Sequence, residues 1–379
     1  MKKISILWLS FFPLLAGAAL SPSLSEISQT FPTVSNLWLK SLITIPSICV
    51  VLGQVVQPKL SRKITAKTQV LGGLFLYALG ALPYIWPSFP IIILSRILLG
   101  IGLSLLVPHT IGLIQANFEG KIQKKLLGYA SALNNFGTVV AVIYAGLVSN
   151  KDWRLVFLIY LLAIISLVTI YLFLPNDKQE VTSPKQATNE KVPYNVVRIW
   201  LKMFLLTVIY FTIPTNLAFY MHDHFQQQGT LIIGILMAIT SLFGVISGMI
   251  FSYFPGRKNS QVQELILIGL FLISMCLLSF TQTLPLFILG LLFSGWGLGW
   301  GLPCFNHQLI STLTHPSSAT LGIGQAMIFL GQFVSPFLIA FMSNLSHQDN
   351  PFLMSLILLG VLLGIAMLDF SKNQPTMDR

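Results

Sequence analysis

The chain has 379 residues, of which 54% are hydrophobic and only 9% are charged, and its mean hydropathy is +0.79. Soluble domains carry roughly a quarter charged residues, so this composition excludes a soluble globule and predicts that lipid surrounds the chain. The formal net charge of +11 is also found in nucleic-acid-binding proteins. The positions of the basic residues, described below, argue against that function.

Apolar segments long enough to cross a bilayer follow one another along the chain. A transmembrane helix needs about 20 predominantly apolar residues. Twelve segments fit: 5–24, 37–57, 69–87, 90–113, 126–148, 154–174, 197–220, 231–254, 264–281, 284–305, 319–342 and 351–370. The apolar runs are continuous rather than alternating, which favours helices over membrane strands. The predicted fold class is an all-α membrane protein with twelve transmembrane helices in two six-helix bundles.

A polar segment separates the first six spans from the last six. It reads PNDKQEVTSPKQATNEKVPYNV, carries charges and prolines, and has no apolar periodicity, which indicates a linker. We expect an N-terminal bundle over residues 1–174, a cytoplasmic linker over 175–196 and a C-terminal bundle over 197–379. The basic start and apolar middle of residues 1–20 also fit a cleaved signal peptide, but its removal would leave an odd number of spans.

The basic residues predict the orientation of the spans. With the N-terminus inside, eighteen of the 22 Lys and Arg residues face the cytoplasm, as the positive-inside rule requires. They are Lys2, Lys3, Lys59, Arg62, Lys63, Lys67, Lys121, Lys124, Lys125, Lys178, Lys185, Lys191, Arg198, Lys202, Arg257, Lys258, Lys372 and Arg379. The positive charge is therefore a topology signal, and no nucleic-acid partner is expected. Both termini are predicted to be cytoplasmic.

The fourth span of each half carries an internal repeat. Residues 89–108 align without a gap to residues 284–303 at an offset of 195, pairing Gly100 with Gly295 and Pro108 with Pro303. The fifth spans, 128–146 and 322–340, also align. Duplicated bundles of this kind build transporters that bind their substrate between the halves near the bilayer midplane.

Arg96 is where the two copies of the repeat differ most in chemistry. It lies inside an apolar run, and its counterpart is Leu291. A charge at membrane depth is costly and is a functional-site hypothesis by default. Arg96 could hold an anionic substrate group or set the protonation of a nearby acid. The alternative is a structural arginine bonded to backbone carbonyls.

Several short motifs resemble those of one transporter family. Between spans two and three, PKLSRKITAK keeps Lys63 and Lys67 of the pattern Gly-x-Leu-x-Asp-Arg/Lys-x-Gly-Arg-Arg/Lys but lacks its acid. The corresponding loop of the second half keeps Gly256, Arg257 and Lys258. The fourth span has an Arg followed by glycines, as in Arg96, Gly100 and Gly102.

The fifth span resembles the antiporter pattern Gly-x8-Gly-x3-Gly-Pro-x2-Gly-Gly. Small residues survive at Gly128, Gly137 and Gly146, but Val142 replaces the proline; the repeat copy has Gly322, Gly331 and Pro336. Small residues allow close helix packing, and proline permits a bend. Together these motifs are similar to the major facilitator superfamily, over essentially the whole chain.

The resemblance implies cytoplasmic gate loops at Lys63, Lys67 and residues 256–258, although the same basic residues also serve as inside anchors. It implies a central cavity lined by spans one, four, seven and ten, with five, eight and eleven beside it. The expected cavity residues are Asn134, Asn135, Tyr210, Asn216, Trp296, Trp300, Gln325 and Gln332. Interhelical hydrogen bonds are the equal alternative for the amides, and packing is the alternative for the tryptophans.

Proton carriers are less clear, because no Asp or Glu lies clearly in the middle of a span. Glu26, just past the end of span one, and Asp223, at the end of span seven, are candidates, as are His109 and His307 near inner span ends. Each could instead be a wet surface group. Residues 222–224, HDH, have poor spacing for a metal site, so no metal is expected.

The absence of several nucleotide-binding and catalytic motifs narrows the classes of function that the sequence can have. The sequence has no GxxxxGK[ST], HExxH or GxSxG, so neither an ATP-driven pump nor an enzyme is expected. The three cysteines, Cys49, Cys276 and Cys304, lie in apolar segments and read as small buried hydrophobes. No cofactor is expected.

These observations favour a secondary active transporter in a bacterial plasma membrane. The leading hypothesis is proton-coupled export of drug-like or other small organic compounds by alternating access, with a monomer binding a small-molecule substrate and protons, or less favourably Na⁺. A proton-coupled uptake symporter or an organic-anion carrier of the same fold is the alternative, in which Arg96 is the counter-charge. A non-transporting membrane sensor is the third class.

Overall fold

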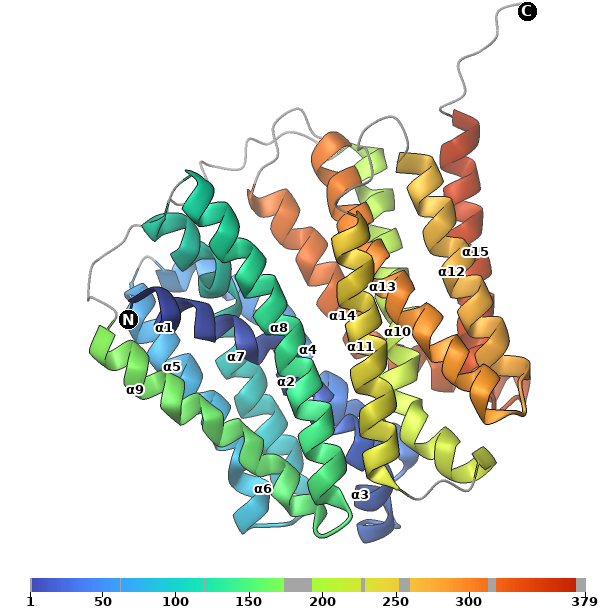
Figure 1. The fold of residues 1–379 in the computed structure, drawn as a ribbon, viewed down its shortest axis with the longest axis horizontal. Helices are drawn as coiled ribbons and strands as arrows, with labels where there is room; N and C mark the ends of the chain where they lie inside the picture. The colour runs from blue at the N-terminus through green and yellow to red at the C-terminus, as the bar shows by residue number, and fades with distance from the viewer. Residues whose placement is uncertain are drawn as a thin grey trace, which may run out of the picture. The chain divides into compact units, whose positions relative to one another are not determined.

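The computed structural model describes residues 2–61, 63–118, 120–173, 193–225, 229–251, 260–312 and 318–372. Within these ranges every regular element is a helix (Figure 1). In the described part of the chain, twelve helices or helical groups are long and apolar enough to cross a membrane, as the hydropathy pattern predicted. Most of the predicted linker lies outside the described residues.

The first span is assembled from short helices. It comprises α1 (Lys2–Trp8), η1 (Leu9–Phe11), α2 (Phe12–Ala18), η2 (Ser21–Ser23) and α3 (Leu24–Thr30). Prolines stand in the first turns of α2 and η2, where the missing N–H costs no hydrogen bond. The span therefore continues to Thr30, and the expectation that Glu26 lies past its end is wrong, because Glu26 is in the first turn of α3.

The other spans of the first half are α4 (Asn36–Ser61), a broken third span, α7 (Phe89–Asn117), α8 (Gly120–Ser149) and a sixth span. The third span comprises α5 (Ala66–Ala78), the 3-10 helix η3 (Leu79–Ala81) and α6 (Leu82–Ile85). The sixth comprises the 3-10 helix η4 (Trp153–Leu161) and α9 (Leu162–Phe173).

The spans of the second half are each one continuous helix. They are α10 (Tyr194–Phe225), α11 (Thr230–Phe251), α12 (Ser260–Phe280), α13 (Leu284–Thr312), α14 (Ser318–Ser346) and α15 (Pro351–Lys372). Polar side chains begin the sixth and twelfth spans in the same way. Asp152 accepts a hydrogen bond from Arg154 N, and Asn350 accepts one from Phe352 N, so each satisfies a free helix N-terminus.

The repeat extends to the helix boundaries. Helices α7 and α13 both have 29 residues and begin and end at positions 195 residues apart, and each contains a proline, Pro108 or Pro303. A proline inside a helix leaves one carbonyl without its donor and permits a bend. The duplicated sequence thus produces duplicated helices.

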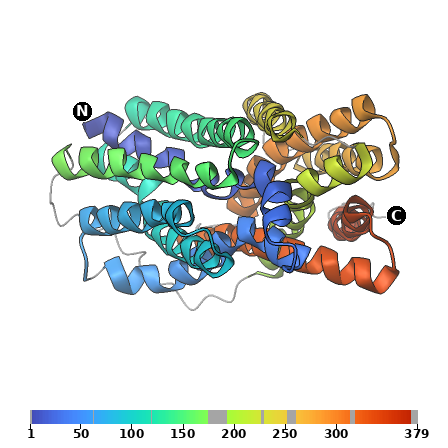
Figure 2. The same cartoon turned by 90° about the horizontal axis from the view of Figure 1, so that it is seen from below.

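The described chain forms two compact units. The first contains residues 1–186 and 214–241, and the second contains 187–213 and 242–379, so that α10 and α11 each contribute to both. In the first unit α7 packs on α4 and α5, and α2 packs on α8. In the second unit α12 packs on α13 and α15, and these three helices lie side by side in Figures 1 and 2.

Candidate functional site

Arg96 of α7 is fully buried in the first unit. Its Nη1 donates to the Tyr160 hydroxyl at 2.8 Å and to the Ala16 carbonyl at 3.3 Å, and its Nη2 donates to the Gly80 carbonyl at 3.4 Å. The guanidinium carbon lies 4.4 Å from the Tyr160 ring centroid and 5.4 Å from that of Phe157. One side chain thereby joins α2, η3, η4 and α7.

The carbonyls that Arg96 contacts come from the breaks in the first and third spans. Ala16 lies in the last turn of α2, whose final carbonyls have no donor in the helix, and Gly80 lies in the 3-10 turn between α5 and α6. Because a backbone polar group in lipid must be satisfied within the protein, Arg96 stabilises these interruptions. This is the structural alternative that the sequence left open.

The charge of Arg96 has no carboxylate partner among the described residues, where every ion pair involves other basic groups. All three acceptors of the guanidinium are neutral oxygens, and its Nε–H has no acceptor within the described part of the chain. Neutral acceptors and aromatic faces stabilise a cation without cancelling its charge. The first unit therefore contains a buried, uncompensated positive charge.

The second unit buries a different cluster of charges, which the sequence did not predict. Lys202 of α10 lies 2.6 Å from Glu264 Oε1 of α12 and 2.6 Å from Asp369 Oδ2 of α15. Arg198 Nη1 lies 2.5 Å from Asp369 Oδ1, and its Nη2 donates to the Ile365 carbonyl at 3.0 Å. The Gln308 amide donates to Glu264 Oε2 at 3.0 Å. Two cations and two carboxylates leave this cluster with no net charge.

Sequence reasoning missed this cluster because Arg198 and Lys202 fit the positive-inside rule and were explained by it. A usable signal was present, however. Glu264 begins the ninth predicted span and Asp369 ends the twelfth, and α10 carries two basic residues one helical turn apart. Charges of opposite sign at span ends on the same side of the membrane are candidates for pairing.

Two of the predicted proton carriers, Glu26 and Asp223, lie among other charged and titratable side chains of the first unit. Glu26 of α3 and His222 of α10 interact electrostatically, as do Lys40 of α4 and Asp223. His222 Nδ1 is 3.0 Å from Asp223 Oδ1, and the side chains of both are largely exposed. His224 instead stacks on Tyr220 at 3.9 Å between centroids, so the two histidines of the HDH motif point to different partners.

The predicted histidines differ in their surroundings. His109 is buried, and its Nε2 is 3.0 Å from Gln69 Oε1, to which Gln57 Nε2 also donates at 2.8 Å. The pair with an amide oxygen assigns the proton to Nε2 of His109. His307 lies in α13 and its Nδ1 has no partner among the described residues.

The predicted cavity residues divide between the two units. Asn134, Asn135 and Asn216 belong to the first, and Tyr210, Trp296, Trp300, Gln325 and Gln332 belong to the second. Asn134 Oδ1 accepts from Leu14 N at 3.2 Å, and Gln325 donates to Asn306 at 3.3 Å. Trp300 is buried, donates from Nε1 to the Gln263 carbonyl at 3.0 Å and packs edge-on against Phe251. Several of these side chains thus join neighbouring helices.

Close helix contacts occur at most of the predicted small residues. A Cβ on Gly102 would lie 2.5 Å from the Gly73 carbonyl oxygen, and one on Gly146 would lie 2.9 Å from Leu231 Cα. Backbone also faces Gly100, Gly137 and Gly331, whereas Gly322 has open space around it. Gly128 lies in α8, and Pro336 lies inside α14. These contacts bring α7 against α5 and α8 against α11.

The predicted gate loops are described only in part. Lys63 is exposed in the turn after α4, and Lys67 Nζ donates to the Tyr171 carbonyl at 2.9 Å and lies over the Tyr171 ring. Lys67 therefore contacts the end of α9. Gly256, Arg257 and Lys258 lie outside the described residues.

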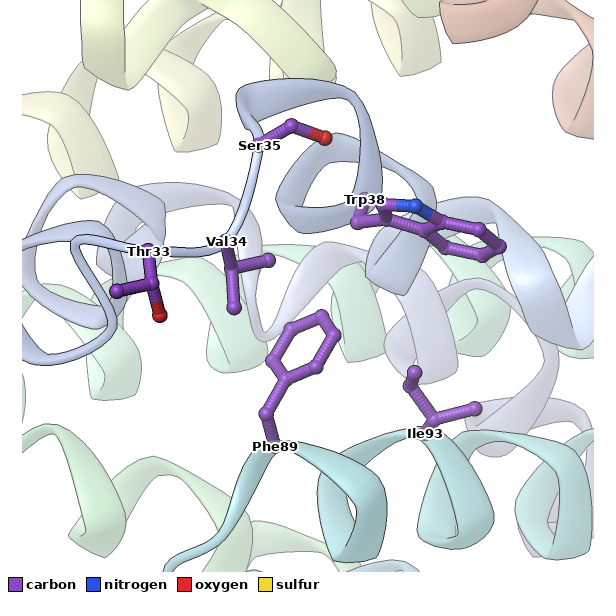
Figure 3. Close-up of a pocket in the computed structure, with 6 residues that line it drawn as sticks. All are labelled: Thr33, Val34, Ser35, Trp38, Phe89 and Ile93. Atoms are coloured by element: carbon purple, nitrogen blue, oxygen red, sulfur yellow. The ribbon is translucent and has the colours of Figure 1, made fainter.

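An open pocket lies where α4 and α7 begin (Figure 3). Phe89 and Ile93 of α7 face Trp38 of α4, and Thr33, Val34 and Ser35 complete the lining. Trp38 is 52% exposed, as is common for tryptophan at a membrane interface. The lining offers two hydroxyls and no charged side chain, so this pocket has little to bind a polar solute.

Comparisons with known proteins identify the family. The sequence profile described as the Major Facilitator Superfamily matches residues 6–336. The chain belongs to this superfamily. It is therefore a multi-pass membrane transporter that moves a small-molecule substrate, and not an enzyme.

Individual relatives are distant. The chain is 25% identical over 400 aligned positions to the "Probable nitrate transporter NarT" of Staphylococcus epidermidis, covering 98% of each chain. A bacterial homologue of the human lysosomal transporter Spinster matches with a TM-score of 0.75 at 13% identity, over 99% of this chain and 98% of that one. The nucleoside transporter NupG matches with a TM-score of 0.73 at 12% identity, over 99% and 100%. These structural likenesses show the fold alone.

Proposed function

We propose that this chain is a proton-coupled secondary transporter of a small anion in a bacterial plasma membrane, working by alternating access. The observation that carries the proposal is the buried guanidinium of Arg96, which has only neutral acceptors and no carboxylate within ion-pair distance among the described residues. The buried charges of the second unit, in contrast, balance.

An uncompensated charge acts over distance in a medium of low dielectric constant. Two unit charges about 10 Å apart interact by roughly 1.7 kcal/mol at an effective dielectric constant of about 20. A monovalent anion on the transport path would be stabilised by this amount and a cation would be destabilised equally. Arg96 therefore favours anions even where it does not touch them.

The similarity to a protein named as a probable nitrate transporter, over 98% of both chains, supports the same solute class. Nitrate is a small monovalent anion, so the field of Arg96 has the right sign for it. The resemblance comes from sequence over the full length and is independent of the buried-charge argument.

Export of drug-like compounds is the second candidate. The small residues of α8 favour it, since they follow the antiporter-like pattern at Gly128, Gly137 and Gly146. Gly146 packs against the backbone of α11. In this alternative the contact between α8 and α11 matters more than the charge of Arg96.

The proposal keeps the predicted topology. We propose a monomer with both termini in the cytoplasm, with bundles over residues 1–174 and 197–379 and a linker over 175–196. Protons rather than Na⁺ are the proposed coupling ion. The proposed direction is uptake of the anion together with protons. An anion that entered alone would move against the inside-negative membrane potential, and co-transported protons compensate its charge.

Proteoliposomes containing the purified protein test the function. Substrate-evoked currents and internal pH would be recorded for nitrate, nitrite, acetate and lactate, and for ethidium and tetraphenylphosphonium as organic cations. The proposal predicts that an anion evokes transport that is enhanced by an inward proton gradient. Transport of the organic cations with no response to any anion would support the export candidate and contradict the proposal.

A further inference from the structure

The charge cluster of the second unit lies outside the site of the proposed function. It consists of Arg198, Lys202, Glu264 and Asp369, and it joins α10, α12 and α15. The side chain of Lys202 is 2% exposed and that of Glu264 is 6% exposed. Buried ion pairs often contribute little net stability, because desolvation offsets the attraction. The cluster is thus an expensive arrangement for a purely structural link between three helices.

The two carboxylates do not share the cations equally. Asp369 lies within 2.6 Å of both Lys202 and Arg198, whereas Glu264 has Lys202 alone as a cationic partner among the described residues. If Glu264 took up a proton, Lys202 would keep Asp369 as its counter-ion. If Asp369 took up a proton, Lys202 would keep Glu264, but Arg198 would have no carboxylate partner left among the described residues. Neutralising Glu264 is therefore the less costly change.

We infer that Glu264 is the proton-binding carboxylate of the transport cycle. This inference rests on the proposed proton coupling and names the group that carries the proton. In the step, Glu264 accepts a proton from a hydronium ion, one O–H bond of the hydronium breaks and leaves neutral water, and an O–H bond forms on the carboxylate. Lys202 loses its attraction to Glu264 and retains its ion pair with Asp369.

The groups around Glu264 accommodate both of its protonation states. From α13, the Gln308 amide donates to Oε2, and it also lies 3.8 Å from Cys304 Sγ. Oε1 faces Lys202 of α10, and Asp369 of α15 lies behind the lysine. The Gln308 bond persists when Glu264 is neutral, since the carbonyl oxygen of a carboxylic acid still accepts.

Asp369 connects the buried pair to water. Its side chain is 24% exposed, while the Lys202 side chain that it contacts is almost fully buried. On the predicted orientation, Arg198 and Asp369 lie at the cytoplasmic ends of their spans. A proton leaving Glu264 on this side would reach the cytoplasm past Asp369, which suits release after inward transport.

Glu264→Gln tests the inference in proteoliposomes. Glutamine has the shape of a protonated glutamate and keeps an acceptor for Gln308. Two activities would be measured with labelled nitrate: exchange across the membrane without a gradient, and accumulation driven by an imposed pH gradient. The inference predicts that exchange stays within about threefold of wild type and loses its dependence on pH, while accumulation falls at least tenfold. Asp349→Asn, which removes an exposed carboxylate outside the spans, should change neither activity.

The outcomes separate the two proposals. If the wild type exchanges nitrate but shows no accumulation in a pH gradient, proton coupling itself fails. If the wild type accumulates nitrate and Glu264→Gln does so equally, only the assignment to Glu264 is overturned.

A second variant decides the case in which Glu264→Gln is inactive in exchange. The double substitution Lys202→Gln with Glu264→Gln removes the pair without leaving an unmatched charge. Recovery of exchange without gradient-driven accumulation supports the inference. Recovery of both activities, or of neither, overturns it, because the cluster would then be dispensable for coupling or required for the conformational cycle as such.

Discussion

The two units bury their basic residues in opposite ways. In the first, Arg96 donates to the Ala16 and Gly80 carbonyls and to the Tyr160 hydroxyl, where the first and third spans break into short helices. In the second, Leu291 occupies the counterpart of Arg96, α10 and α12 are continuous, and the buried cations Arg198 and Lys202 pair with carboxylates.

The two halves of this duplicated fold therefore stabilise buried cations in different ways: the first with neutral oxygens, the second with carboxylates. A guanidinium has five donors in a fixed geometry, so it can satisfy several free carbonyls and permit breaks in neighbouring helices. An ammonium and a carboxylate instead form a unit whose charge depends on one proton. The first unit thus keeps a permanent charge, and the second contains a charge that protonation can change.

The largest effect is expected for Lys202→Ala. This change leaves the buried Glu264 and the partly exposed Asp369 with only Arg198 as a cation, and removing one partner of a buried pair typically costs about 3–5 kcal/mol. Thermal unfolding in detergent would measure the loss. Lys151→Ala, which removes an exposed lysine, is the matched control and should leave the unfolding midpoint unchanged; equal midpoints for both variants would show that the cluster contributes no stability.

Arg96→Leu gives the first unit the residue type found at the aligned position of the second unit, Leu291. We expect a loss of about 2–3 kcal/mol, from three hydrogen bonds of about 1 kcal/mol each, and less than for Lys202→Ala because no buried carboxylate is left behind. The same unfolding assay applies. A larger loss than that of Lys202→Ala would reverse the ranking of the two clusters.

Close packing in the second unit predicts a smaller effect. Gly299 of α13 faces the Gly244 backbone of α11, whereas the residue 195 positions earlier is Ser104, which faces Gly53. Gly299→Ala should therefore destabilise the protein by about 1–3 kcal/mol through overpacking. Gly269→Ala, where a Cβ meets open space, should be neutral or stabilising by unfolding midpoint, and equal destabilisation by both would rule out a specific contact.

The smallest effect concerns acid pH. A hydrogen bond from Arg154 lowers the pKa of Asp152 below its usual 3.8. A carboxylate with a depressed folded-state pKa stabilises the fold above its unfolded value and loses this contribution as the pH falls through the folded value. Asp152→Asn keeps a helix cap, as Asn350 shows, but loses the charge. The difference in unfolding midpoint between wild type and variant should shrink from pH 6 to pH 3, and a constant difference would contradict the ion-pair contribution.

The fold was largely predictable because continuous apolar segments and the distribution of Lys and Arg report directly on spans in lipid. The breaks in the first and third spans were harder to predict from the sequence, since Pro13 and Pro83 are compatible with either a kink or a new helix. The superfamily resemblance was confirmed by the match over residues 6–336.

The candidate site was predicted only in part. Arg96 stood out because a lone charge in an apolar run is visible in the sequence. The Glu264 cluster was not, because its members come from three spans and each alone fits a charged span end. Pairing between distant helices is a property of the packed structure that hydropathy along the chain does not contain.

The most direct test of the central claim is nitrate transport by Arg96 variants that differ in charge. Arg96→Lys keeps the positive charge and Arg96→Gln removes it, and thermal unfolding in detergent would verify that both are folded. If the buried charge selects an anion, kcat/KM for nitrate should fall about tenfold or more in Arg96→Gln and stay within about threefold of wild type in Arg96→Lys. Equal nitrate transport by Arg96→Gln and wild type would contradict the account.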